Sequence, residues 1–160
     1  MDRYQKILSN ITYIKHMNKI NELEKDRKFC RHGSNHFLDV CRIAMLINVD
    51  EAYSIDKDII YAAALLHDIG RDAEYLDGIS HEIASADISK GILLESGFKA
   101  EEIENIIKAI LNHRNKSIKD ERSLSGLIYR ADKLSRPCYL CDSYNECNKA
   151  YEKRNDTLIW

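Results

Sequence analysis

The sequence is poor in residues that interrupt helices, with a single proline, Pro137, and six glycines among 160 residues. Apolar residues instead recur at spacings of three and four nearly throughout, which is the period of an α-helix. No apolar run is long enough to span a membrane, and none follows the charged N-terminus, so we expect neither a membrane anchor nor a targeting helix. Internal repeats, low-complexity segments and linkers are also missing. These absences favour one all-α domain, for which the length is sufficient.

The sequence also has little net charge, because 24 lysines and arginines nearly balance 26 aspartates and glutamates. The charge therefore gives no broad reason to expect nucleic acid or a membrane surface as the main partner. Five cysteines in a chain without an export signal indicate a reducing compartment, where clustered thiols more often hold a metal than form disulfides. We expect a cytoplasmic protein and leave the oligomeric state open, with a homodimer among the alternatives.

The apolar pattern predicts five to six helices and a Cys-containing C-terminal tail. Ile7, Ile11, Ile14 and Met17 indicate the first helix, and Leu46 is expected to face inward in the second. Gly70 is expected to end the third, and residues 71–79 to form a short polar loop. The remaining helices are expected over residues 81–96, 101–113 and 123–135. We predict a helical domain over residues 1–137, with its core at about 35–136, and a tail over residues 138–160 that packs on or trails it.

Two hydrophilic residues, His67 and Asp68, close an otherwise apolar helix. A buried carboxylate is costly unless it is paired, hydrogen-bonded or bound to a metal. Taken alone, the two residues fit an exposed helix end, where a histidine is favourable. His36, His81 and His113, however, also lie at predicted helix ends, and Asp132 lies at the edge of an apolar face. Imidazoles and carboxylates arriving from five helices are what a metal site in a helical bundle requires.

The order of these residues resembles the H…HD…H…H…D signature of HD-superfamily phosphohydrolases. The surrounding words match too, over roughly residues 35–136: HFLDVCRIA, LLHDIGR, HEIASADI, AILNHR and YRADKLSR. The resemblance implies an HD-domain bundle with a mononuclear or dinuclear centre. By position, His36, His67, Asp68 and Asp132 would hold the first metal, and Asp68 would bridge to a second held by His81 and His113.

The sequence is similar to the bacterial branch of this superfamily that cleaves dinucleoside tetraphosphates symmetrically. Arg71, however, stands where a lysine commonly follows the HDxG word. The GYP motif of the cyclic-dinucleotide phosphodiesterases is missing, which argues against that substrate class. An imidazole-rich ligand set suits Fe or Mn, and also Zn, Ni or Co, better than Mg alone.

We therefore expect a metal-dependent phosphohydrolase that uses metal-activated water on a phosphate ester or anhydride, in a nucleotide. Asp68 and Arg71 are the predicted catalytic residues. The cations that follow closely on ligand positions are candidate phosphate-binding residues, with a solvated surface charge as the alternative for each: Arg71, Arg114, Lys116, Lys133 and Arg136. Two other functions stay open, a dinuclear-iron oxygenase on the same scaffold and a non-catalytic nucleotide- or redox-sensing module.

The remaining histidines and cysteines divide into two kinds. His16 is interpreted as a surface residue, His32 is ambiguous, and Cys41 fits a core thiol. Cys138, Cys141 and Cys147 cluster in a polar tail, which is typical of a metal-bound loop, and Cys30 is the nearest candidate for a fourth ligand. We predict a structural zinc ion or an iron–sulfur cluster there, with free thiols in a mobile tail as the alternative. The prediction requires both chain segments to leave the His/Asp site on the same side.

Overall fold

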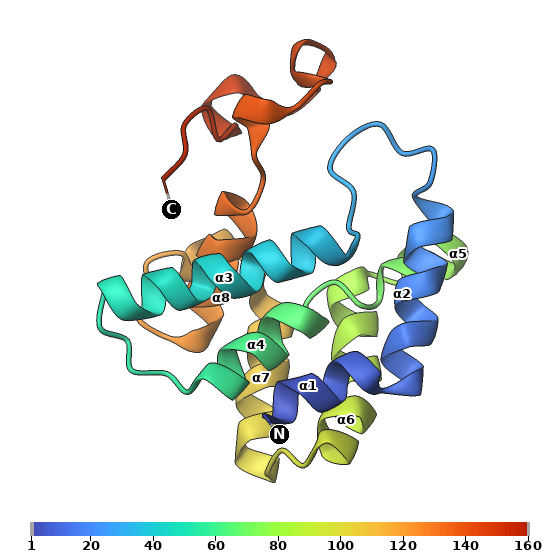
Figure 1. Ribbon diagram of the computed structural model, residues 1–160, viewed down its shortest axis with the longest axis vertical. Coiled ribbons are helices and arrows are strands. Elements are labelled where there is room, and N and C mark those ends of the chain that lie inside the picture. Colours follow the sequence, from blue (N-terminus) through green and yellow to red (C-terminus); the bar gives the residue numbers. More distant parts are fainter. Residues whose placement is uncertain (1, 160) are drawn as a thin grey trace.

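The computed structural model describes residues 2–159. Met1, the first residue of the predicted helical domain, and Trp160, the last residue of the predicted tail, lie outside the described residues. The prediction of an all-α fold is confirmed, since the described residues contain no strand (Figure 1). The helices are α1 (Arg3–Ser9), α2 (Ile11–Leu23), α3 (Ser34–Asp50), α4 (Lys57–Leu66), α5 (Arg71–Asp77), α6 (His81–Ser96), α7 (Ala100–Asn112) and α8 (Leu124–Leu134).

The predicted first helix is two helices, because the chain breaks at Asn10. The Asn10 side chain accepts hydrogen bonds from the backbone N–H groups of Thr12 and Tyr13, which caps α2 and ends α1. The break rotates the apolar stripe away from the predicted one. Ile11 is 81% exposed and Ile14 is 42% exposed, so these two residues of the apolar pattern that indicated one helix lie outside the core.

The segment predicted as a polar loop after Gly70 is instead the helix α5. Its acidic first turn, with Asp72 and Glu74, suits the positive end of a helix dipole. Gly70 itself has φ −90°, so it does not end the preceding helix in the left-handed conformation that favours glycine. A Cβ atom at Gly70 would lie 2.4 Å from the backbone nitrogen of Ser85 on α6, so this glycine permits a close approach of two backbones.

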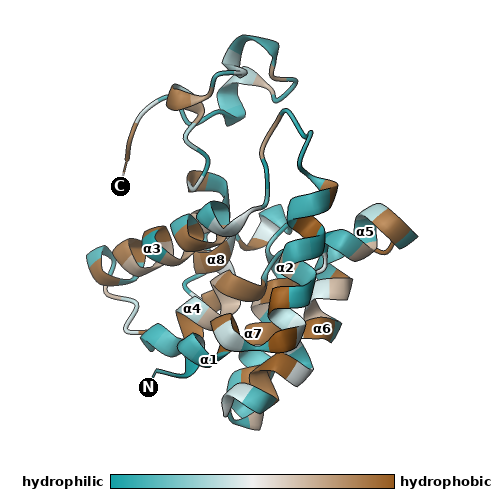
Figure 2. Cartoon of the chain, turned by 45° about the vertical axis from the view of Figure 1, so that its right-hand side comes forward, coloured by the Kyte–Doolittle hydropathy of each residue, from teal (hydrophilic) through white to brown (hydrophobic). Residues whose placement is uncertain are grey.

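The core surrounds α4, whose residues are buried on nearly every side. Helices α3 and α7 pack against α4, and α8 packs against both. Figure 2 shows that apolar residues concentrate in these helices, whereas the tail is mostly hydrophilic. Leu46 is an exception to the predicted core, because it lies on the outer side of α3 and is 45% exposed. No helix in the described part of the chain is long and apolar enough to cross a membrane.

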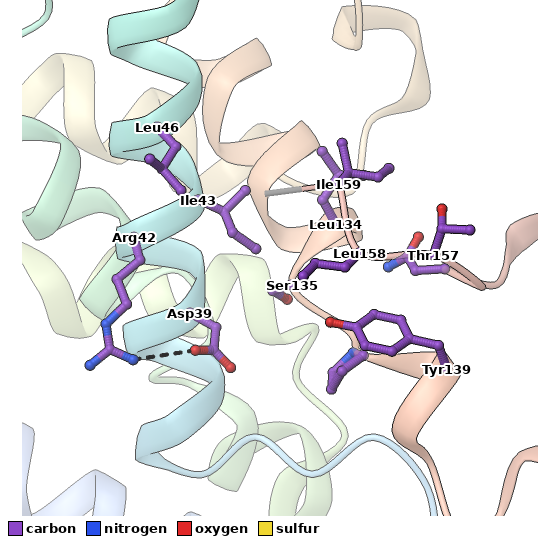
Figure 3. A pocket seen from close by; sticks show the side chains of 12 residues that line it. Asp39, Arg42, Ile43, Leu46, Leu134, Ser135, Tyr139, Thr157, Leu158 and Ile159 are labelled. Carbon is purple, nitrogen blue, oxygen red and sulfur yellow. Dashed lines mark hydrogen bonds and ion pairs between the residues drawn. The ribbon is translucent and has the colours of Figure 1, made fainter.

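The described part of the tail, residues 138–159, contains three short 3-10 turns, at Cys138–Leu140, Tyr144–Glu146 and Tyr151–Lys153. Asn155 attaches it to α8, since its side-chain amide donates to the carbonyl oxygens of Lys133 and Arg136 at 2.7 and 2.9 Å. Leu158 and Ile159 return to α3 and line a cavity of about 290 Å³ beside Ile43 (Figure 3). The tail and the segment between α2 and α3 project from the same side of the bundle (Figure 1).

Candidate metal centre

The six predicted ligands converge in the centre of the bundle, and all are buried. His36 lies in the first turn of α3, and His67 and Asp68 directly follow α4. His81 begins α6, His113 follows α7, and Asp132 lies in the last turns of α8. Helix ends thus aim polar side chains at a point that the apolar core encloses, although whether these residues bind metal stays a prediction.

The ligand atoms form two groups that share Asp68. The first group contains His36, His67, Asp68 and Asp132, and the second contains Asp68, His81 and His113; within each group the ligand atoms lie within 4.8 Å of one another. One carboxylate oxygen of Asp68, Oδ2, is 3.6 Å from His36 Nε2 and 3.3 Å from His67 Nε2. The other, Oδ1, is 3.2 Å from His81 Nε2 and 3.4 Å from His113 Nε2. Asp68 is therefore placed to bridge two ions.

Each of the four imidazoles has a second partner at Nδ1. The Nδ1–H groups of His67 and His113 donate to the backbone oxygens of Ala64 and Ile110 at 2.7 and 2.6 Å. Because a carbonyl oxygen only accepts, these bonds place the ring proton on Nδ1 and leave the Nε2 lone pair facing the centre. This tautomer is the one that a metal-binding histidine needs.

His81 and His36 are oriented by side chains. Nδ1 of His81 lies 2.9 Å from a carboxylate oxygen of Glu74, which is a strong acceptor. Ser135 Oγ donates its hydrogen to the Asp132 backbone oxygen at 2.8 Å, so it is free to accept from His36 Nδ1 at 3.2 Å. Both rings therefore also direct Nε2 toward the centre, and the sequence pattern did not reveal either partner.

The centre is rich in electron pairs and therefore suits a cation. The Nε2 atoms of His36 and His67 are 3.2 Å apart, as are those of His81 and His113. Because each ring carries its proton on Nδ1, the two Nε2 atoms of each pair face each other with their lone pairs. Burial alone would raise the pKa of Asp68, but His67 and hydrogen bonds from the other histidines hold it well below its ordinary value. Although burial opposes it, the carboxylates raise the pKa of His67 to about 9. A proton and a metal ion would compete for this Nε2 atom, and the donor set fits two divalent ions.

A fifth imidazole, His32, lies beside the centre, which settles its ambiguous role in the sequence. It is buried, its Nδ1 is 2.6 Å from Glu24 Oε1, and its Nε2 is 3.7 Å from Asp68 Oδ2. Tyr75 donates to the same Glu24 oxygen at 2.5 Å. The only signal in the sequence for this pair was a glutamate, Glu24, eight residues before His32. His16, interpreted as a surface residue, instead lies partly buried with its Nδ1 2.9 Å from the buried Asp72 carboxylate.

The predicted phosphate-binding cations do not all reach the centre. Lys116, Lys133 and Arg136 line a cavity of about 640 Å³ that opens onto Asp132, and Arg71 lines it too. Arg71 also donates from Nε to Asp68 Oδ1 at 3.2 Å and from Nη1 to Glu74 at 2.9 Å. Arg114 does not line this cavity, because its guanidinium group turns toward Glu82 at 3.4 Å and is 54% exposed.

The tail contributes cations to this cavity that the sequence analysis missed. They are Lys149, Lys153 and Arg154, and Glu152 is the carboxylate among them. Their sequence signal was weak, because isolated cations in a polar tail usually indicate a solvated surface. The tail therefore forms one wall of the cavity above the candidate metal centre.

Fold and site together define an all-α protein with a buried histidine–aspartate centre suited to two divalent metal ions. The sequence of residues 33–136 matches the family model described as HD domain, and the chain belongs to this family. A protein of Clostridium beijerinckii described as uncharacterized is 49% identical over the full length of both chains. The family supports divalent metal binding by the chain and a hydrolase in general.

A solved structure is also similar to this chain. It is described as a predicted HD superfamily hydrolase from an uncultured Thermotogales bacterium, and it is 30% identical with a TM-score of 0.59. The match covers 76% of this chain and 66% of that chain, slightly less than two thirds of its length. The shared fold therefore extends over about three quarters of this chain.

Proposed function

We propose that the chain is a metal-dependent phosphohydrolase that cleaves a phosphate ester or anhydride of a nucleotide. The observation that carries this proposal is the 640 Å³ cavity over Asp132, because seven of its lining residues are lysines or arginines and only two are carboxylates. A surplus of cations beside a buried metal centre favours a substrate with several negative charges. A small neutral substrate gains nothing from it.

The bound ions would supply the Lewis acidity that activates water and stabilises charge on phosphoryl oxygens. The chain's own residues position the reactants. Asp68, Asp132 and the four oriented imidazoles would hold the ions, and Arg71 lies within hydrogen-bond distance of Asp68, at the border between centre and cavity. Its remaining N–H groups are suited to bidentate contact with a phosphoryl group. Asp68 and Arg71 are accordingly the proposed catalytic residues.

The nucleotide assignment is supported by Tyr129. Its ring lines the same cavity, and the Lys133 ammonium group lies 5.4 Å from the ring centroid. An aromatic face next to cations can stack on a base while the cations bind phosphate. A nucleotide with two or more phosphates, which includes dinucleoside polyphosphates, fits this combination of charge and aromatic surface.

The test uses the purified chain loaded anaerobically with Mn²⁺ or Fe²⁺ and a panel of nucleotides, dinucleoside polyphosphates and phosphate monoesters. We expect metal-dependent release of phosphate or of a nucleotide product from at least one nucleotide. No hydrolysis of any panel member by protein with its metals bound would refute the proposal. Consumption of oxygen with an organic substrate would favour the oxygenase instead.

A matched pair of variants tests the role of the cavity. Lys116→Ala removes a lining cation, whereas Arg114→Ala removes a cation two residues away that pairs with Glu82 outside the cavity. We expect Lys116→Ala to raise KM about tenfold, the scale of one charged hydrogen bond. Arg114→Ala should leave KM within about twofold of the parent value, since an exposed ion pair contributes little.

A further inference from the structure

Four cysteines from two distant parts of the chain line one small cavity on the side of the bundle where the tail lies. Cys30 belongs to the segment between α2 and α3, and Cys138, Cys141 and Cys147 belong to the tail. The two segments leave the His/Asp centre on the same side (Figure 1), as the sequence prediction required. All four side chains are free thiols.

The segments around these cysteines are joined mainly by polar contacts. The Arg154 guanidinium donates to the backbone oxygens of Tyr144 and Cys147 at 3.0 and 2.8 Å. Lys28 pairs with Glu146, and Arg136 donates to the Arg31 backbone oxygen at 2.7 Å. Ion pairs on the surface stabilise little, and the tail buries few apolar side chains. An additional source of order is therefore needed at this cavity.

Two local features suit thiolate ligands. The Lys149 backbone N–H donates to Cys147 Sγ at 3.5 Å, and such a bond stabilises a negatively charged sulfur. Cys30 has φ 44°, a left-handed conformation that costs a non-glycine residue about 1 kcal/mol. This backbone conformation occurs at the cysteine that the α2–α3 segment contributes to the cavity.

We propose that Cys30, Cys138, Cys141 and Cys147 ligate an iron–sulfur cluster, separate from the His/Asp centre. A single zinc ion with Zn–S bonds of about 2.3 Å in a tetrahedron needs sulfur atoms about 3.8 Å apart. Among the described residues, the only sets of three or more ligand atoms within 4.8 Å of one another are the two His/Asp groups. No three of the four cysteine sulfurs lie within 4.8 Å of one another, which suits a cubane cluster, because each cysteine there binds a different iron atom.

The cluster would also support the substrate cavity. Cys30, Lys149 and Arg154 line both the cysteine cavity and the 640 Å³ cavity over the metal centre. Loss of the cluster should release the wall that presents the tail cations to substrate, while the buried His/Asp ligands keep their positions. This consequence rests on the proposed function, whereas the cluster itself does not.

The test is the acid-labile sulfide content of the full chain, purified anaerobically or reconstituted with ferrous iron and sulfide. The sulfide content distinguishes an iron–sulfur cluster from iron bound at the His/Asp centre, because iron at the His/Asp centre brings no sulfide with it. We expect a brown protein with about four sulfides per chain, as a cubane cluster contains, and loss of sulfide in Cys141→Ala. Cys41→Ala is the control, because Cys41 is buried in α3 away from the cavity and its loss should leave the sulfide content unchanged.

The outcomes distinguish a failure of the cluster proposal from a failure of the proposed phosphohydrolase function. A colourless parent protein that binds one zinc ion per chain through the four thiols would overturn the cluster. Four freely reactive thiols without metal or sulfide after reconstitution would overturn any centre at this site. Circular dichroism of Cys141→Ala checks that its helices remain, and the parent's sulfide content decides the question even if this variant does not fold. For any substrate that the parent protein hydrolyses, the KM of Cys141→Ala should be higher than that of the parent. The number of metal ions bound at the His/Asp centre should be unchanged.

Discussion

Gly70→Ala should damage both the fold and the second metal site. The added Cβ would lie 2.4 Å from the Ser85 nitrogen and 2.7 Å from the carbonyl carbon of Ala84, whereas ordinary contacts begin at 3.4 Å. The two backbones must therefore separate by about 1 Å, the difference between 2.4 and 3.4 Å. Overpacking of this kind costs about 1–3 kcal/mol. For a chain of this size the melting temperature should fall by about 3–10 °C.

The displacement also acts on the metal ligands. Gly70 follows Asp68 by two residues, and the opposing turn of α6 begins with His81, whose Nε2 is 3.2 Å from Asp68 Oδ1. A metal site tolerates about 0.2 Å of change in its distances, so a shift of about 1 Å should remove the second ion. Loss of the hydrogen bond from the Gly70 N–H to Ser85 Oγ, now 2.9 Å, adds to the separation.

The control is Gly91→Ala on the exposed face of the same helix, where a Cβ meets no atom within 4 Å. It should stabilise the protein by about 0.5–1 kcal/mol, because alanine favours the helix, and it should leave the metal count unchanged. Thermal unfolding and elemental analysis of both variants give the comparison. A Gly70→Ala protein with the parent's melting temperature and two metals per chain would refute the argument from close approach.

Four further predictions concern the centre itself. Asp68→Ala should lower bound metal at both groups and reduce turnover about a thousandfold or more, because metals supply several kcal/mol of transition-state stabilisation; normal hydrolysis by the folded variant would contradict this. His113→Ala should remove mainly the second metal, and elemental analysis that still finds two ions with unchanged rates would exclude the dinuclear arrangement. Arg71→Ala should raise KM or lower kcat about tenfold to a hundredfold without changing metal content, the loss of a charged hydrogen bond; kinetics like the parent's would exclude this role. Chelation should lower the melting temperature, since an ion at a hundred times its Kd stabilises the folded state by about 2.7 kcal/mol, and readdition of Mn²⁺ should restore it.

The helical class and the identity of the six central residues followed from the sequence. Helical periodicity is a local property, and a polar pair such as His67 and Asp68 at the end of an apolar helix is visible without coordinates. Caps such as Ser123 and stops such as Gly97 act within one turn, so α6, α7 and α8 have nearly the predicted bounds. Local errors arose where a short-range competitor changed the pattern, as Asn10 does between α1 and α2.

Tertiary structure decided everything that depends on distances across the chain. It placed the imidazoles in the two groups around Asp68 that the family resemblance implied, and it alone paired His32 with Glu24 and separated Lys116 in the cavity from Arg114 outside it. None of these follows from spacing, because side-chain direction at a helix end depends on how neighbouring helices pack. Gly70 is the clearest example: its sequence context indicates a helix stop, but only the backbone of α6 against it reveals a contact that no other residue type permits.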